Sequence, residues 1–312
     1  MSQGYEALER GAAWMNLSGR GRIAVRGRDR ARLLHNLASN EVKRLAAGSG
    51  CYAFLLSPQG RIQADFTLLA FDDHMLLDTE PELREKVIQH IRRYIVADQV
   101  ELEDVTASTG AIALEGPEAA HVLANAGGSA PTSDYQHAAW GEGGEVTVAR
   151  ISLTGQPGFR IYAPLGEADG IIRRLSEAGA RPAGEEDARV VRMENGRPRY
   201  GEDIRDTSLP QETGQMRAVS FTKGCYLGQE IVERIRAQGH VNRKLVRLRL
   251  ASTLPAAAGA KLTADGAEAG EITSSIYSPA QGSAIALAYL RTSYAAPGQA
   301  VTAGEIPAVV LG

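Results

Sequence analysis

The 312-residue chain lacks the features of a secreted, membrane-spanning or metal-containing protein. It has two cysteines, Cys51 and Cys225, and their wide separation argues against a disulfide framework. No apolar run approaches the ~20 residues that span a bilayer, and the N-terminus has no charged region followed by an apolar core and cleavage site, so we expect a cytoplasmic protein. The six histidines show no metal-ligand spacing, and we expect no metal held within one subunit.

Charge is also nearly balanced, at a formal net value of -3, so nothing in the whole chain favours nucleic acid or membrane binding. The one local cationic excess runs from Arg234 to Arg249. Such a run is usually a solvated face, although it can attract an acidic ligand tail, an acidic protein or RNA. RNA is the weakest of these because no aromatic residues are interleaved. The sequence has neither a glycine-rich phosphate-binding loop nor the residue order of a Ser-His-Asp triad, so it gives no indication of a kinase or a hydrolase.

An internal repeat dominates the first half of the chain. Residues 23–34 and 112–123 share one pattern: a short strand, a glycine, an acid two residues later, then a helix. This pattern predicts pseudo-symmetric halves of an α+β domain. Further strands are expected at 52–56, 62–71, 74–78, 145–153 and 159–163, and helices from Pro81 to Ile95, at 167–178 and at 185–194. The first three of these strands form an antiparallel meander.

From Lys244 onward the sequence changes to short β-rich runs separated by glycine and proline turns, at 245–250, 261–263, 270–274, 284–290 and 301–310. This texture predicts a small closed antiparallel barrel. We therefore expect an α+β region of two intertwined subdomains at 1–242 and a barrel domain at 243–312. Residues 195–222 form a long loop, which in a compact protein is usually functional, and the active loop extends to residue 230.

The loop leads into Cys225, which lies between Lys223 and the predicted start of a helix. Unpaired N–H groups at a helix N-terminus and a nearby lysine both favour a thiolate. The alternative is that this cysteine is only a small packed residue. Cys51 begins an apolar strand and is expected in the core.

Two acids stand out as candidate ligand-binding residues. Glu194 ends a helix, two positions after Arg192, and enters a glycine-proline turn. A carboxylate there can accept two parallel N–H bonds from a planar heterocycle such as a pterin, or form a salt bridge with Arg192 or Arg197. Asp65 interrupts an apolar strand pattern, either on the wet face of a sheet or opposite a ligand amine.

Together these stretches resemble the YgfZ-type folate-binding proteins, relatives of the glycine cleavage system T-protein (aminomethyltransferase), over almost the whole chain. The signature match is Lys223-Gly224-Cys225-Tyr226-Leu227-Gly228-Gln229-Glu230. Supporting matches are Arg192 to Pro198 with Tyr200-Gly201, Leu209 to Glu212, Leu55 to Arg61, Thr154 to Phe159 and Gly270 to Ser275.

The resemblance implies a T-protein-like fold and a protein that binds tetrahydrofolate, or a one-carbon derivative, and assists assembly or repair of iron–sulfur clusters in client proteins. It makes Cys225 and Lys223 the catalytic residues, and Glu194, Asp65 and Arg192 the cofactor-binding residues. Ala64 replaces one member of the T-protein acidic pair.

T-proteins usually carry acids where this chain has Gln156 and Arg160, and they lack the motif cysteine. These departures weigh against aminomethyl transfer. Aminomethyltransferase activity and a non-catalytic folate-binding scaffold remain the alternatives, and whether the protein catalyses a reaction stays open.

Overall fold

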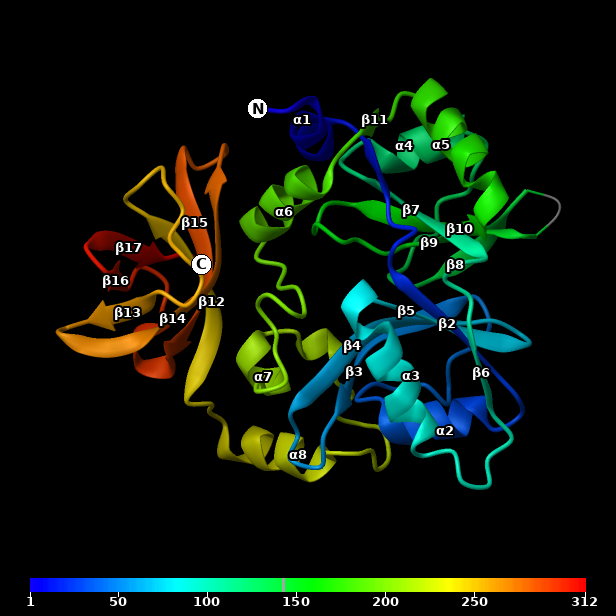
Figure 1. Cartoon of the computed structure of the whole chain (residues 1–312), viewed down its shortest axis with the longest axis horizontal. Coiled ribbons are helices and arrows are strands. Elements are labelled where there is room, and N and C mark those ends of the chain that lie inside the picture. The colour runs from blue at the N-terminus through cyan, green and yellow to red at the C-terminus, as the bar shows by residue number, and fades with distance from the viewer. Residues whose placement is uncertain (142–143) are drawn as a thin grey trace.

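The computed structural model describes residues 1–141 and 144–312. Two sheet-and-helix units lie side by side, and a barrel packs beside them, next to α6 and α7 (Figure 1). The first unit is a five-stranded sheet in the order β3-β4-β5-β2-β6 with two helices. Its elements are β2 (Gly21–Arg26), α2 (Arg30–Leu37), β3 (Ser49–Leu56), β4 (Ile62–Ala70), β5 (His74–Thr79), α3 (Arg84–Arg92) and β6 (Glu101–Asp104).

The predicted meander is confirmed, since β3, β4 and β5 pair antiparallel in sequence order. Cys51 is buried in β3, where burial raises the pKa of its thiol to about 12. The helix expected from Pro81 is shorter than predicted. A 3₁₀ turn at Pro81–Leu83 precedes α3, which ends at Arg92, so the apolar Ile95 packs from the following turn.

The second unit is a six-stranded sheet in the order β11-β1-β7-β10-β9-β8. Its elements are α1 (Gln3–Arg10), β1 (Ala13–Asn16), β7 (Thr109–Glu115), α4 (Ala119–Asn125), β8 (His137–Trp140), β9 (Val146–Ala149), β10 (Gly158–Pro164), α5 (Ala168–Glu177), β11 (Arg181–Pro182) and α6 (Glu185–Glu194). Its core contains Leu114, Phe159 and Leu175.

The repeat is confirmed as β2-α2 and β7-α4, one copy in each sheet. Gly27 and Gly116 each leave the strand with positive φ, +96° and +127°, a conformation that favours glycine. Asp29 and Glu118 then occupy the N-cap positions with nearly identical backbone angles. The two copies therefore turn from strand to helix in the same way.

The predicted closed barrel is confirmed, with strand order β12-β15-β14-β13-β16-β17. Its strands are β12 (Arg243–Leu250), β13 (Lys261–Ala264), β14 (Ala267–Ser278), β15 (Ser283–Arg291), β16 (Ala300–Ala303) and β17 (Ile306–Val310). The β-rich run at 301–310 divides into the last two strands because Gly304, at φ +61°, turns the chain back.

Residues 195–222 are not a continuous loop as predicted. They contain the short helix α7 (Pro210–Thr213) and a 3₁₀ turn at Met216–Ala218 before α8 (Gln229–Gln238) begins. The Glu212 carboxylate accepts a hydrogen bond from the Leu209 backbone N–H at 3.0 Å and so fixes the start of α7. Within the described residues, no helix is both long and apolar enough to cross a membrane.

Candidate functional site: two adjoining cavities and an exposed thiol

Two cavities adjoin near the loop that follows α6, and they share Arg20, Glu80 and Leu153. The larger has a volume of about 560 Å³ and is lined by residues of β1, α6 and the 199–202 turn. The smaller has a volume of about 140 Å³. Its charged and aromatic lining residues are Arg20, Tyr52, Asp65, Glu80, Asp134, Tyr135, Arg150, Arg160, Arg197 and Arg217.

A buried ion-pair cluster forms the wall between the cavities and the sheets. The Asp78 carboxylate receives the Arg20 Nε at 2.6 Å, the Arg160 Nη1 at 3.1 Å and the Tyr162 hydroxyl at 2.8 Å. Burial opposes ionisation of Asp78, but the two guanidinium groups outweigh it and hold its pKa at about 2. Arg20 also pairs with Glu80. The cluster thus fixes Arg20 and Arg160 at the cavity surface.

Asp65 on β4 lies in the smaller cavity, where the Tyr52 hydroxyl donates a hydrogen bond to its Oδ2 at 2.6 Å. Burial, and then the nearby charge of Glu80, raise the pKa of Asp65 to about 6. Asp65 therefore changes protonation close to neutral pH. Its neighbour Ala64 is buried on the opposite face of the strand, so Asp65 is the member of this pair that faces the cavity.

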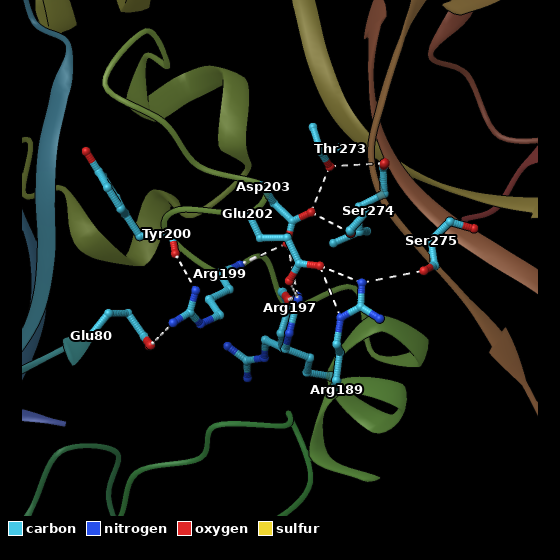
Figure 2. Close-up of polar contacts among 12 residues, drawn as sticks. Glu80, Arg189, Arg197, Arg199, Tyr200, Glu202, Asp203, Thr273, Ser274 and Ser275 are labelled. Atoms are coloured by element: carbon cyan, nitrogen blue, oxygen red, sulfur yellow. Dashed lines mark hydrogen bonds and ion pairs between the residues drawn. The ribbon is translucent and has the colours of Figure 1, made fainter. Parts of the chain in front are cut away.

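Arg192 lines the larger cavity, but its guanidinium group forms salt bridges with two acids of the following turn. Its Nη1 lies 3.0 Å from Asp203 Oδ2, and its Nη2 contacts Glu202. Asp203 is fully buried and also accepts hydrogen bonds from Thr273 at 2.7 Å and Ser274 at 2.6 Å on β14 (Figure 2). The network therefore joins the end of α6 to the barrel.

Glu194 lines neither cavity. Its carboxylate accepts hydrogen bonds from the Tyr5 hydroxyl, at 3.1 and 3.2 Å, from the Ser278 hydroxyl and from the Ala280 backbone N–H at 3.3 Å. Its backbone carbonyl accepts from Arg247. Glu194 thus connects α1, α6 and the barrel, and both of its carboxylate oxygens already have partners.

Arg247 belongs to the cationic run from Arg234 to Arg249, and part of that run is used inside the protein. Arg243 pairs with Glu212 at 3.0 Å, joining β12 to α7. Arg234 and Arg249 are exposed. The run is therefore divided between contacts that hold the barrel and a solvated remainder.

Cys225 is exposed and precedes Gln229, the first residue of α8, by four positions. A turn lies between them, closed by the Gln229 side chain, which accepts a hydrogen bond from the Tyr226 backbone N–H at 3.3 Å. Cys225 lines neither cavity. Among the predicted site residues, Asp65 and Arg192 therefore line a cavity, whereas Cys225 does not.

The Lys223 ammonium lies among backbone carbonyls at the end of α2. It donates to the carbonyls of His35, Ala38 at 2.6 Å and Asn40 at 2.9 Å. Burial lowers the pKa of Lys223 to about 8. This lysine satisfies carbonyls left unpaired at a helix C-terminus and fastens the Cys225 segment to the first sheet unit.

Sequence reasoning missed Arg20, Tyr52, Asp78 and Glu80. The available signal was weak: Asp78 and Glu80 alternate at the end of an otherwise apolar strand, and Tyr52 stands opposite Thr67 on the neighbouring strand. Their partners lie far away in the sequence, so their spacing carries no motif. Among the described residues, no group of three His, Cys, Asp or Glu side chains is arranged to hold a metal ion.

Comparison with known proteins identifies the family. Residues 1–223 match the model of the GCVT N-terminal domain, and residues 243–310 match that of the glycine cleavage T-protein C-terminal barrel domain. The chain belongs to the glycine cleavage T-protein family. It is 34% identical to an aminomethyltransferase of Rubrobacter xylanophilus over 293 residues, which cover 92% of this chain and 78% of the relative.

An aminomethyltransferase of Exiguobacterium sibiricum is 29% identical over 93% of this chain and 81% of its own. The solved structure of the glycine cleavage system aminomethyltransferase T from Bartonella henselae superposes with a TM-score of 0.90, covering 99% of this chain and 88% of that one at 22% identity. That likeness confirms the expected T-protein-like fold.

Aminomethyltransferases of this T-protein family use tetrahydrofolate. The cavities of this member fit it in two respects. The larger one has a volume in the range of small-molecule sites, and Asp65 offers a desolvated carboxylate in the adjoining space. The Glu194 carboxylate is not available to tetrahydrofolate in this conformation, because it already accepts hydrogen bonds from Tyr5, Ser278 and Ala280.

Proposed function

We propose that this T-protein family member binds tetrahydrofolate in the two adjoining cavities and assists the assembly or repair of iron–sulfur clusters in client enzymes through Cys225. The observation that carries the proposal is an exposed thiol that does not line the cavity in which Asp65 lies. A thiol that serves a client protein must reach that protein's surface, whereas a thiol that reacts with bound folate must face the folate.

Within this proposal, residues 1–242 form the folate-binding region and residues 243–312 a separate barrel domain. Tetrahydrofolate supplies an amine that can carry a one-carbon unit. Asp65 accepts an N–H of that amine, while Tyr52 fixes the orientation of the carboxylate. Arg192 maintains the wall of the larger cavity through Asp203 and Glu202.

A pterin-binding role for Glu194 requires its carboxylate to exchange the contacts with Tyr5 and Ser278 for the N–H groups of the ring. Such an exchange would loosen the connection between α1 and the barrel. Folate binding and barrel position are then linked, because the same carboxylate takes part in both.

The Cys225 sulfur is the atom that contacts iron or sulfur of the client's cluster, which is substrate and not a resident cofactor. Lys223 acts by holding the segment that carries this thiol, since its ammonium is bound by three carbonyls. The proposed clients are therefore proteins whose cluster site can approach the end of α2 and the start of α8.

Aminomethyl transfer is the second candidate function, and the similarity of this chain to aminomethyltransferases favours it. Two contacts favour the first candidate. Gln156 donates to Glu9 at 2.7 Å, and Arg160 pairs with Asp78, where T-proteins usually carry acids. A non-catalytic folate-binding scaffold is the third candidate, and it differs from the first in not requiring Cys225.

Titration with tetrahydrofolate by calorimetry tests the folate site. We expect binding to the wild-type protein and weaker binding to Asp65→Asn, in which the ligand amine loses a carboxylate. Glu194→Gln tests whether the Glu194 carboxylate takes part. Absence of binding to the wild-type protein would refute the folate part of the proposal.

Complementation tests the thiol. Cys225→Ala should fail to restore the activity of iron–sulfur enzymes in cells that lack this protein, whereas Cys51→Ala, which removes the buried thiol, should restore it. Full restoration by Cys225→Ala would favour the scaffold. Turnover of the purified protein with the other glycine cleavage components would favour aminomethyl transfer.

A further inference from the structure

The smaller cavity has an excess of positive charge. Five arginines and three carboxylates line it. Arg20 and Arg150 have carboxylate partners, but within the described part of the chain Arg197 and Arg217 have no carboxylate within ion-pair distance. Arg217 instead lies over the Tyr52 ring, 5.2 Å from its centroid. Arg217 also hydrogen-bonds the Tyr135 side chain. Because neither guanidinium group is paired with a carboxylate, both can bind an anion at this cavity.

Arg160 is the most unusual of these arginines, because it is 3% exposed and its Nε has no hydrogen-bond partner among the described residues. Its one ion pair is to Asp78, which is already held by Arg20 and Tyr162. A buried donor left without a partner is destabilising, and natural proteins rarely keep one without a reason. Because Arg160 lines the cavity, its positive charge would attract an anion bound there.

The size of the cavity limits the ligand. Its volume of about 140 Å³ is a quarter of the 560 Å³ of the adjoining cavity, so a small molecule suits it. A folate molecule is far larger, so it extends into the adjoining cavity or lies there entirely.

We propose that the smaller cavity binds a small organic monocarboxylate, whose carboxylate is held by Arg160, Arg197 and Arg217. A planar carboxylate matches the two-donor geometry of a guanidinium group. Asp65 on the same cavity wall repels a second carboxylate, and so the ligand carries only one. A hydroxyl or amino group on the ligand complements the Asp65 carboxylate. This inference goes beyond the proposed function. The small ligand and the folate amine would compete for Asp65, so binding of the carboxylate is measured in the absence of folate.

Calorimetric titration of the full-length protein without folate tests the inference, with glycolate, glycine and acetate as probes and sulfate as the control anion at constant ionic strength. We expect wild-type protein to bind glycolate or glycine more tightly than acetate, and any of the three more tightly than sulfate. Arg197→Gln and Arg217→Gln should each weaken carboxylate binding about tenfold, the loss expected for one charged hydrogen bond.

Arg249→Gln is the matched control, since Arg249 is an exposed arginine outside this cavity, and its binding should equal that of the wild type. Arg197 and Arg217 are preferable to Arg160 as test positions, because they form no buried ion pair that folding requires. Equal carboxylate binding by all three variants, or no binding to the wild type at up to about 10 mM ligand, would overturn the inference.

A parallel titration with tetrahydrofolate separates this inference from the proposed function. Loss of folate binding with carboxylate binding retained would refute only the proposed function. Folate binding with no carboxylate binding would refute only the cavity assignment, and it would leave the arginines as part of the wall.

Discussion

Replacement of Asp203 by alanine should detach the turn after α6 from the barrel. The Asp203 carboxylate accepts four hydrogen bonds, from Thr273, Ser274, Arg192 and the Arg199 backbone N–H, at 2.6 to 3.1 Å. Loss of one partner from a buried, paired charge costs about 3–5 kcal/mol.

The expected cost lies at the low end, about 3 kcal/mol, because two partners have alternatives. Arg192 keeps Glu202, and the Thr273 hydroxyl also lies 3.0 Å from the Leu287 carbonyl. The remaining loss falls on Ser274 and on the backbone N–H of Arg199.

Urea denaturation measures the total loss in the free energy of unfolding, and hydrogen exchange shows which parts of the fold are destabilised. Exchange should accelerate in residues 197–205 and in β14, while β4 and β5 in the first sheet keep their protection. Thr273→Val is the matched control, which should cost about 1.5 kcal/mol, because it removes one of the four hydrogen bonds to the Asp203 carboxylate. If Asp203→Ala costs less than about 1 kcal/mol, or if exchange rises equally in all three parts of the fold, the network does not hold the barrel.

Three further predictions concern single residues. Asp65→Asn should raise the free energy of unfolding above pH 6, because the raised pKa makes ionised Asp65 costly in the folded state. Urea titrations at several pH values should show that this gain disappears as the pH falls from about 6 to 3.8, the ordinary pKa of an aspartate. Cys225 should react rapidly with a thiol reagent in the native protein while Cys51 reacts only after unfolding, and equal rates would contradict the burial of Cys51. Gly116→Ala should lower the melting temperature, since its Cβ would lie 2.4 Å from the Gly11 carbonyl oxygen and its φ is +127°, whereas Ala at Gly170, which meets nothing within 4 Å, should be tolerated.

The parts of the fold that the sequence predicted well depend on local signals. Gly27 and Gly116, each followed by an acid at the helix N-cap, mark the strand-to-helix turn within a few residues of chain. The strands that the sequence did not predict are those whose formation depends on pairing with a neighbouring strand. The strand β6 reads Glu-Leu-Glu-Asp and is formed by its ladder with β2, and β11 has only two residues, aligned by β1. Such segments have no periodicity of their own, so the neighbouring strand supplies the signal.

The site shows the same division. Asp65 was identifiable because a single acid interrupts an apolar strand, and that contrast is visible locally. The cluster of Arg20, Asp78 and Arg160 was not identifiable, because each member is unremarkable within its own segment and only the packing of two sheets brings them together. Buried ion pairs are tertiary features, and a single sequence gives no sign of which charges will meet.

Lys223 and Glu194 show why a motif position does not by itself give a residue its role. Both were expected to act through charge, the lysine on the thiol and the glutamate on a pterin. In the fold, Lys223 binds three carbonyls at the end of α2, and Glu194 binds Tyr5 and Ser278 on two other elements. The protein itself therefore supplies polar partners for each charge. Lys223 holds the Cys225 segment to α2, and Glu194 connects α6 to α1 and the barrel. An alanine substitution at either position therefore disturbs the local structure as well as removing a charge. Glu194→Gln, which removes the charge and keeps the shape, and Lys223→Arg, which keeps the charge and changes the shape, separate the two effects better.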